Sequence, residues 1–384
     1  MNPVEMILIG CGMMGLRHIR GYAELERVRP GSLHLKAVCD LCLEAAQGAA
    51  DEAERLLGYR PAVYRSAEEA LSVEKGIEAA DVVTPPRSHP QVVIPLLKAG
   101  LDVLVEKPLA VRVEDGREMV ETAKSHRRIL AVAENNRRDP MNRLMRHIIQ
   151  TGFIGRPHFV IQMSVSAVGR RVLASPWRHS KEEGGLALDI GIHQAYILEM
   201  LMGPIDTIHA VSRQVWSRRL WHRPDGSVEE IDVESEDLFA ATLTFESGAM
   251  GSWVMHFGSP GAGRWERVIF GELGTAEGPP DRSGRPVRVQ RGREVLEGDK
   301  LVEALPDFHL NEIESSLFGE RPGGYSFEST VTDRKLIAAE VWDFIEALRC
   351  RREPEVNGKL GLRSVAIISA LTRSALSGEP ISVK

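Results

Sequence analysis

The segment Glu106-Lys107-Pro108 carries a side chain that could stabilise negative charge on a reacting oxygen. It follows the short apolar run 103–105, which is typical of a buried strand. The proline disfavours helical geometry at Lys107 and holds it extended, so the ammonium group could point at a substrate hydroxyl. The same spacing also fits an exposed lysine in an ordinary turn, and position alone leaves both interpretations open.

A second segment pairs the carboxylate of Asp189 with the imidazole of His193. On a helix, residues four positions apart share one face. A carboxylate beside an imidazole orients the ring and raises its basicity, so the pair could take a proton from an alcohol while hydride leaves the same carbon. The alternative, an acid at a helix start and a histidine satisfied in the core, is the commoner outcome for an isolated pair.

A third segment could bind phosphate. The apolar run 6–9 stops at Gly10, and Gly10, Gly12 and Gly15 fit G-x-G-x-x-G before a helical pattern over 16–25. Gly10 would permit a tight turn, Gly12 a close approach of pyrophosphate to the backbone, and Gly15 close packing of helix on strand. The N–H groups at the helix start would face the phosphates. A plain glycine turn would share the pattern, but the flanking strand and helix favour a dinucleotide site.

An acid at the end of the second apolar run indicates which dinucleotide would bind. Asp40 follows the run 33–39, about where a carboxylate meets the adenosine ribose hydroxyls. Its charge would repel the 2′-phosphate of NADP, and Leu41 and Cys42 follow it in place of a Ser or Arg that would accept one. The sequence therefore predicts NAD rather than NADP, although an acid that merely closes a strand would look the same.

Short apolar runs alternate with helical patterns up to residue 134. Uninterrupted apolar runs suit strands buried on both faces of a parallel sheet. Residues 1–134 are therefore predicted to form an α/β domain, a doubly wound parallel sheet of the Rossmann kind with its ligand at the carboxyl ends of the strands. The runs are 6–9, 33–39, 81–83, 103–105 and 129–133, and helical patterns occupy 43–57, 67–71, 89–99 and 114–125.

The turn after the third run would lie over the cofactor. Thr84-Pro85-Pro86 stops the strand, because proline fixes the backbone and removes a donor. His89 follows shortly after and is either a cofactor contact or simply a residue at the start of the next helix.

Residues 135–384 have a different pattern. The segments 238–246 and 249–257 are joined across Ser247-Gly248, which predicts a hairpin, and 241–245 alternate apolar with polar residues. We expect an α+β domain on a largely antiparallel sheet, which binds substrate and other subunits. Residues 278–330 hold many Gly, Pro and Arg and are predicted to be a long insertion.

Bulk properties exclude several classes of protein. A net charge of −6 and a pI near 6.1 provide no basic field for nucleic acid or an anionic membrane. No apolar run is long enough to span a membrane, and the N-terminus enters the first strand without a signal peptide, so we expect a cytoplasmic protein. Cys39 and Cys42 stand at a strand end rather than a helix start, which favours incidental thiols, and no metal site is expected.

These motifs occur in the order found in the Gfo/Idh/MocA family of sugar and cyclitol dehydrogenases, which the chain resembles along nearly its whole length. The glycine pattern, the Asp40 strand end, Thr84-Pro85-Pro86, Glu106-Lys107-Pro108 and Gly184-Gly185 followed by Asp189-x-Gly191-x-His193 carry the resemblance. It implies that Lys107 contacts the reacting hydroxyl and the nicotinamide region, that His193 is the general acid/base and that Asp189 binds substrate. The family often has an acid three residues beyond the histidine, where this chain has Tyr196, which puts the sugar specificity in doubt.

The resemblance also implies the wider site and the assembly. Catalysis would use Lys107, Asp189 and His193, and the substrate pocket would add side chains from both predicted domains. Cofactor contacts would come from Gly10, Gly12, Met13, Met14, Gly15, Asp40, Thr84, Pro85, Pro86, His89, Glu106 and Lys107. Their position in the chain, rather than the resemblance, predicts further substrate contacts beside Lys107, Asp189 and His193. These are Asn135, Arg137, Trp177 and Arg178, with His309 or Asn311 as further candidates.

Three functions remain open at this point. The first is an NAD-dependent oxidation of a secondary alcohol in a sugar, cyclitol or related polyol by a homodimer or homotetramer. The second keeps the fold but uses transient oxidation to cleave a glycosidic bond, with the hydride returned to the product. The third is a non-catalytic regulator that senses NAD, against which the presence of Lys107, Asp189 and His193 argues.

Overall fold

A computed structural model describes residues 2–172, 175–223 and 225–383, and the chain divides into two compact units. The first unit comprises Met1–Arg138, Leu310–Glu320 and Phe327–Leu362. The second comprises Asp139–His309, Arg321–Ser326 and Arg363–Lys384. Among the described residues, no helix is both long and apolar enough to cross a membrane.

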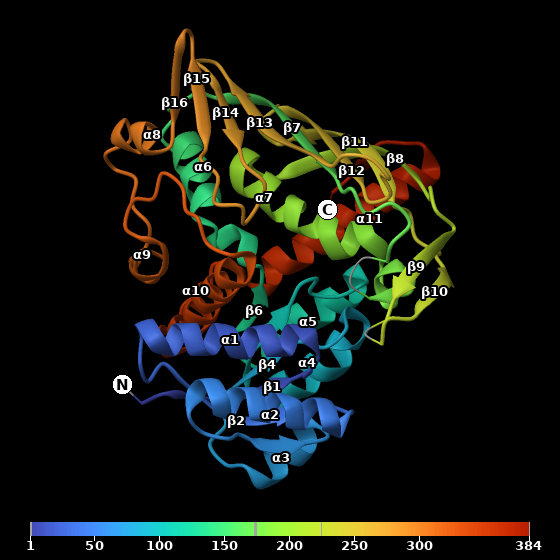
Figure 1. Ribbon diagram of the computed structural model, residues 1–384, viewed down its shortest axis with the longest axis vertical. Coiled ribbons are helices and arrows are strands. Elements are labelled where there is room, and N and C mark those ends of the chain that lie inside the picture. Colours follow the sequence, from blue (N-terminus) through green and yellow to red (C-terminus); the bar gives the residue numbers. More distant parts are fainter. Residues whose placement is uncertain (1, 173–174, 224, 384) are drawn as a thin grey trace. The chain divides into compact units, whose positions relative to one another are not determined.

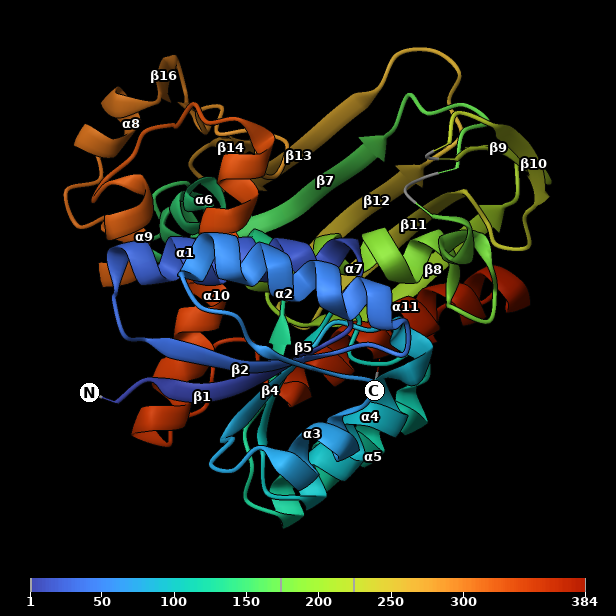
Figure 2. The same ribbon diagram turned by 60° about the horizontal axis from the view of Figure 1, so that its bottom comes forward.

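The first unit is built on a parallel sheet of the order β3-β2-β1-β4-β5-β6. The chain adds β2 and β3 on one side of β1 and then returns to add β4, β5 and β6 on the other side. Helices α1 and α2 lie on one face and α4 and α5 on the other (Figures 1 and 2). The strands are β1 (Val4–Ile9), β2 (Leu33–Cys39), β3 (Ala62–Tyr64), β4 (Ala79–Val82), β5 (Asp102–Glu106) and β6 (Leu130–Ala133). The helices are α1 (Met13–Val28), α2 (Leu43–Leu57), α3 (Ala67–Val73), α4 (His89–Lys98), α5 (Val113–Ser125), α9 (Glu312–Phe318) and α10 (Ser329–Cys350).

The predicted doubly wound sheet is confirmed. All four residues of β4 and all four of β6 are buried, as strands covered on both faces require. The edge strand β3 was not predicted, because its three residues are only half-buried and it leaves no buried apolar run in the sequence.

The second unit is built on a sheet of the order β16-β15-β14-β13-β7-β12-β11-β8-β17, in which only the β7–β12 pair is parallel among the described strands. The hairpin predicted at Ser247-Gly248 is confirmed as the β11–β12 connection. The main strands are β7 (Pro157–Val165), β8 (Ile205–Arg213), β11 (Leu238–Phe245), β12 (Met250–His256) and β13 (Arg264–Gly271). The edge strands are β14 (Thr275–Gly278), β15 (Arg288–Arg291), β16 (Glu294–Glu297) and β17 (Ile381–Ser382).

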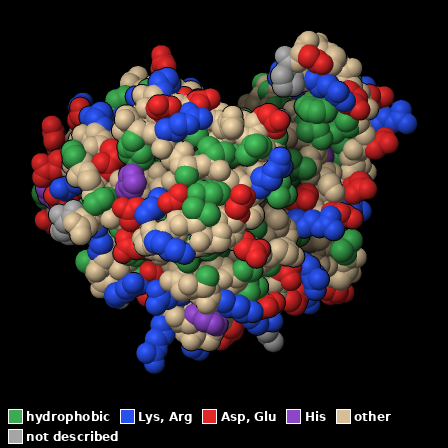
Figure 3. All heavy atoms as spheres, turned by 90° about the horizontal axis from the view of Figure 1, so that it is seen from below, with side chains coloured by type: hydrophobic (Ala, Val, Ile, Leu, Met, Phe, Trp, Pro, Cys, Tyr) green, Lys and Arg blue, Asp and Glu red, His purple; other side chains and the backbone are tan. Residues whose placement is uncertain are grey.

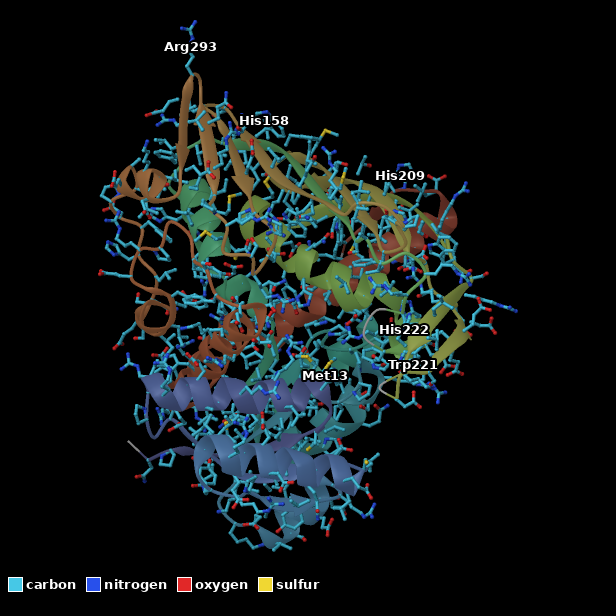
Figure 4. The ribbon with its side chains drawn as sticks, viewed as in Figure 1. Met13, His158, His209, Trp221, His222 and Arg293 are labelled. Carbon is cyan, nitrogen blue, oxygen red and sulfur yellow. The ribbon has the colours of Figure 1, made fainter. Side chains whose placement is uncertain are left out.

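Helices cover one face of this sheet. The inward side chain of Trp253 is fully buried and donates to Gln194 of α7 at 2.6 Å. A separate two-stranded hairpin, β9 (Arg218–His222) with β10 (Val228–Asp232), carries Trp221 and His222 (Figure 4). The helices are α6 (Pro140–Gln150), α7 (Ile192–Met202) and α8 (Asp299–Glu303), and α11 (Gly358–Ser377) continues into this unit from the first.

The units differ from the continuous segments 1–134 and 135–384 predicted from the sequence. Helix α10 belongs to the first unit, where it packs against α1. A Cβ at Gly21 of α1 would lie 2.3 Å from Cγ2 of Ile337, so this glycine permits the close contact between the two helices. A contact between segments this far apart along the chain leaves no local signal.

The interpretation of residues 278–330 as one long insertion stays a prediction, but the structure shows that they do not form one separate segment. Strands β15 and β16 extend the large sheet, with Val287 and Val289 completely buried, while residues 310–320 belong to the first unit. The many Gly, Pro and Arg residues suggested an irregular excursion, but alternate apolar side chains turn inward here as they do in any strand.

Charges of both signs are mixed over the surface. On the face that Figure 3 shows, Lys and Arg side chains lie among Asp and Glu side chains, with no large area of a single sign. This agrees with the modest net charge of −6.

Candidate functional site

The glycine loop has the geometry that a dinucleotide site requires. Gly10 has φ +100°, and a Cβ there would lie 2.6 Å from the Val83 carbonyl oxygen. A Cβ at Gly15 would lie 2.2 Å from the Gly10 carbonyl oxygen, whereas one at Gly12 would meet nothing within 4 Å. Gly10 and Gly15 therefore permit close packing, and Gly12 leaves open space in which a phosphate could approach the backbone.

Helix α1 begins directly after this open space. Gly12 is its N-cap, and its first turn contains no acidic residue that would repel a phosphate. Met13 is 58% exposed at the start of the helix (Figure 4), and the sulfur of the half-buried Met14 accepts a hydrogen bond from Arg17. These residues fit a dinucleotide phosphate group.

The Asp40 carboxylate is hydrogen-bonded to the glycine loop. Its Oδ2 accepts a hydrogen bond from the Cys11 backbone N–H at 2.7 Å, and its Oδ1 accepts one from Cys42 N–H at 2.8 Å. The following residue, Leu41, is 84% exposed. The end of β2 thus holds a negative charge next to the loop, as predicted for the side that recognises a ribose.

Strand β5 delivers Glu106 and Lys107 to the carboxyl edge of the first unit's sheet. Glu106 is the last residue of the strand, and its Oε1 lies 3.2 Å from Nε2 of His18. Lys107 is half-buried directly after it, and the Lys107–Pro108 peptide bond is cis. In an open parallel sheet this edge is where ligands bind.

In the second unit, Asp189 and His193 stand where a π-helical turn, Ala187–Gly191, leads into α7. The sequence predicted a plain α-helix, in which residues four apart share a face. A π turn contains about 4.4 residues, so the angular relation of the two side chains differs from that expectation, and such turns occur frequently at functional sites.

The contacts of Asp189 link it to two further predicted residues. Asp189 is buried, and its carboxylate forms a short ion pair with Arg178. The Arg178 guanidinium stacks over the Trp177 ring at 4.8 Å from the ring centre. The structure therefore brings together three of the predicted substrate contacts, and His193 is half-buried nearby in the chain.

Comparison with known proteins places this arrangement in a family. A sequence profile described as "Oxidoreductase family, NAD-binding Rossmann fold" matches residues 4–134, and one described as "GFO/IDH/MocA C-terminal domain" matches residues 142–277. The chain belongs to the Gfo/Idh/MocA family.

Individual relatives span nearly the whole chain. A D-apiose dehydrogenase from Paraburkholderia graminis is 25% identical over 379 residues, which cover 98% of this chain and 89% of the relative. The crystal structure of an NAD-binding oxidoreductase from Klebsiella pneumoniae is 25% identical, with a TM-score of 0.80 and coverage of 100% and 99%. Levoglucosan dehydrogenase in complex with NADH and L-sorbose is 22% identical with a TM-score of 0.81 and covers 100% of both chains, a likeness of fold.

Within this Gfo/Idh/MocA fold, the turn predicted to lie over the cofactor is tied to the segment after Lys107. His89 is completely buried, with Nε2 2.9 Å from the Thr84 carbonyl oxygen and Nδ1 3.0 Å from that of Pro108. Burial lowers the pKa of His89, against the opposing effect of its contacts with the Thr84, Leu109 and Pro108 carbonyl oxygens. Because both ring nitrogens face backbone carbonyls, we assign His89 a role in joining these two loops. Pro85 and Pro86 lie between Thr84 and His89 in the chain.

Two of the predicted substrate contacts lie in a buried turn of the first unit. Asn135 and Arg137 belong to a short 3₁₀ helix, Asn135–Arg138, and both are buried. The Arg137 guanidinium lies 3.5 Å from the Glu355 carboxylate. A contact of either residue with substrate remains a prediction. Asn311, a further candidate, caps α9 by accepting from Glu314 N–H at 2.8 Å.

A buried charge network in the second unit was not predicted. The Arg267 side chain is completely buried on β13 and lies 2.6 Å from Asp281 Oδ1, and it donates to Gln162 at 2.7 Å and to Asn142 at 2.9 Å. Burial would raise the pKa of Asp281, but Arg267 outweighs it, and Asn142 and His193 also contribute, so the pKa is lowered. The alternation along β13 turns Arg267 inward and could have drawn attention to it.

Among the described residues, no group of three His, Cys, Asp or Glu side chains is arranged to hold a metal ion.

Arg178 and Arg219 place positive charge near His179, a buried histidine ahead of the Asp189 turn. Burial and then the Arg219 charge lower the pKa of His179 from 6.5 to about 4, against opposing effects of Asp237 and Asp189.

Because His179 is held neutral in the folded state, the free energy of unfolding of the protein depends on pH. A base whose pKa is lowered on folding contributes stability that is present above its unfolded pKa of 6.5 and is lost as the pH falls toward 4. The contribution lost by pH ~4.5 is roughly 2–3 kcal/mol. We expect the stability difference between the wild type and His179→Gln, measured by urea unfolding, to fall by that amount between pH ~7 and ~4.5.

Other groups that titrate in this interval are common to both proteins and cancel in the comparison. Asp139 of the same unit, whose pKa burial raises to about 6, is one of them. A difference between the two proteins that stays constant with pH would show that His179 is not held neutral by the fold.

Proposed function

We propose that the protein is an NAD-dependent dehydrogenase that oxidises a secondary alcohol of a sugar, cyclitol or related polyol. The observation that carries the proposal is that this member of the Gfo/Idh/MocA family retains Lys107, Asp189 and His193 together with an open glycine loop. The names of two relatives, D-apiose dehydrogenase and the levoglucosan dehydrogenase solved with L-sorbose, support this substrate class.

The roles of the three residues follow from their chemistry. Lys107 would donate a hydrogen bond to the reacting oxygen and stabilise the developing alkoxide. His193 would accept the hydroxyl proton, and Asp189, fixed by Arg178, would bind and orient the substrate. A bound NAD would supply the hydride acceptor. Each of these residues acts on the oxygen or its proton, and removal of that proton supplies the electron pair that forms the carbonyl group as hydride leaves the carbon.

A screen of sugars and inositols tests the function. Wild-type protein with NAD and each candidate is expected to form reduced nicotinamide, which is followed by absorbance, and the corresponding carbonyl product. Glycosides are included with a parallel measurement of free aglycone. Aglycone release without accumulating NADH would contradict net oxidation and favour bond cleavage through transient oxidation, and NAD binding without any turnover would favour a regulator.

The choice of NAD over NADP rests on Asp40. Its carboxylate is held in place by two backbone N–H groups and stands where it would repel a 2′-phosphate. We expect Asp40→Ser to raise kcat/KM with NADP about 10–100-fold and to lower it with NAD, as a like-charge contact worth one to three kcal/mol would require. Cys42→Ala, which leaves the carboxylate unchanged and adds no hydroxyl group, is the matched control. An Asp40→Ser protein that keeps the wild-type ratio of the two cofactors would contradict the assignment.

We further propose a homodimer or homotetramer assembled through the uncovered face of the large sheet. Apolar side chains occupy the outward positions of adjacent strands, an arrangement that monomers rarely expose over a large area. Met250 is 52% and Val211 64% exposed, and His209 (Figure 4) lies on the same strand as Val211. The half-buried members of this face are Phe159, Ile161, Met163, Val254, Val268 and Phe270.

Light scattering of the purified protein tests the assembly. The wild type is expected to have two or four times the mass of the 42.5 kDa chain. Ile161→Arg, which places a charge in the middle of the face, is expected to lower that mass to one chain's, whereas Val73→Arg, on α3 of the first unit, is expected to leave it unchanged. A monomeric wild type would refute the proposal.

A further inference from the structure

His18 is a completely buried histidine for which the proposed mechanism has no role. It lies on α1 one turn after Gly15, in the first unit. Gly15 lets the helix lie close to the glycine loop, since a Cβ there would come 2.2 Å from the Gly10 carbonyl oxygen. The close packing brings His18 within reach of side chains from β4 and β5.

Two carboxylates hold the His18 ring. Nδ1 lies 2.7 Å from Asp81 Oδ2, and Nε2 lies 3.2 Å from Glu106 Oε1. Because an ionised carboxylate can only accept hydrogen bonds, both ring nitrogens must carry a hydrogen, and the ring is then an imidazolium. The pKa agrees with this geometry: burial lowers it, but Asp81 and Glu106 outweigh burial and raise it well above its ordinary value.

The other groups around the ring support the same arrangement. The Tyr22 hydroxyl forms a short hydrogen bond to the same Asp81 oxygen as His18. Glu340 of α10 is buried near His18 and Glu106, and burial raises its pKa well above the ordinary value. The cluster therefore holds one cation between two carboxylates, with the Tyr22 hydroxyl and the Glu340 carboxyl group at its side.

The two carboxylates differ in how firmly the sheet fixes them. Asp81 lies within β4 and is paired in register with Leu104 of β5. Glu106 lies one residue beyond the last β4–β5 pair, Val82 with Val105, so only β6 continues to pair with it. Hydrogen bonds thus connect Asp81, through His18, to Glu106, which is the first residue of β5 that no longer pairs with β4.

We propose that His18 is a positioning residue, which fixes Glu106, and with it the adjacent Lys107, by linking the Glu106 carboxylate to Asp81 in the body of the sheet. This inference rests on the proposed role of Lys107. Without the imidazolium, the Glu106 carboxylate would lose a charged hydrogen bond in a site where its side chain is only 10% exposed. The carboxylate would then move, and Lys107 would move with it.

Two near-isosteric variants separate the two halves of the link. Asparagine places its amide near the position of Nδ1, and glutamine near that of Nε2. His18→Asn therefore keeps a donor toward Asp81 and loses the contact with Glu106, whereas His18→Gln keeps the donor toward Glu106. With a polyol that the wild type oxidises, we expect His18→Asn to lower kcat about 10–100-fold and His18→Gln no more than about 3-fold.

Three comparisons separate positioning from a general loss of structure. The Kd for NADH is expected to stay within about threefold of the wild type in both variants, since α1 itself is retained. His34→Asn changes another imidazole that contacts a carboxylate, Glu5 at 2.9 Å, and is expected to leave kcat unchanged. In a Lys107→Met background, His18→Asn should cause little further loss, because the effect acts through Lys107. Equal losses in both His18 variants, or full additivity with Lys107→Met, would overturn the proposal.

Crystal structures of the two variants test the link without any activity. A Glu106 carboxylate displaced in His18→Asn but unmoved in His18→Gln supports it. A carboxylate unmoved in both overturns it. This result does not depend on which substrate the protein oxidises, so it remains decisive if the polyol screen fails.

Discussion

Replacing Lys107 with methionine is expected to lower kcat about 100- to 1,000-fold, the cost of removing one donor that stabilises a developing oxyanion. Methionine keeps an unbranched stem and removes the charge and the hydrogen-bond donors. The Kd for NADH, measured by fluorescence titration, is expected to stay within about threefold, because the phosphate loop and Asp40 are unchanged. The loss should therefore appear in kcat and only weakly in cofactor binding.

A matched lysine provides the control for this variant. Lys98 is an exposed residue at the last position of α4 in the same unit, and Lys98→Met is expected to leave both kcat and the Kd unchanged. Lys107→Arg restores the charge without the geometry, and because an ammonium and a guanidinium present their donors differently, only a small part of the activity should return. Unchanged turnover in Lys107→Met would disprove the proposed role.

The sequence was sufficient to predict the position of those candidate site residues that a strand delivers to the edge of the sheet. Gly10, Asp40 and Glu106 each stand at or beside the end of an apolar run, and parallel strands bring such ends to one edge whatever the details of packing. The order of the runs along the chain therefore predicted both the fold and these positions.

Residues whose role depends on partners far away in the sequence could not be predicted in this way. His18 contacts residues 63 and 88 positions away, and Arg267 contacts Asn142 at a separation of 125. A buried histidine or arginine has no local pattern that names its partner. The π turn at Asp189 was missed for a related reason, since its extra residue is imposed by packing around the segment and not by a distinct residue type.

The largest stability effect is expected from Arg267→Leu. The substitution leaves the Asp281 carboxylate without the guanidinium that lies 2.6 Å away, in a site where the Asp281 side chain is only 10% exposed. Removing one partner of a buried ion pair costs about 3–5 kcal/mol, because the remaining charge loses its compensation. Urea unfolding followed by tryptophan fluorescence measures this loss, since Trp253 and Trp265 both belong to the second unit.

The double variant Arg267→Leu/Asp281→Asn separates stability from catalysis. Removing the second charge as well should recover most of the lost free energy, since a neutral amide no longer needs a counter-ion. Asp281 also lies close enough to His193 for the two side chains to interact electrostatically. We therefore expect a double variant that is stable but has a lower kcat, because the surroundings of the proposed general base have changed. If kcat returns together with stability, the network serves the fold alone, and His193 takes its proton without the help of Asp281.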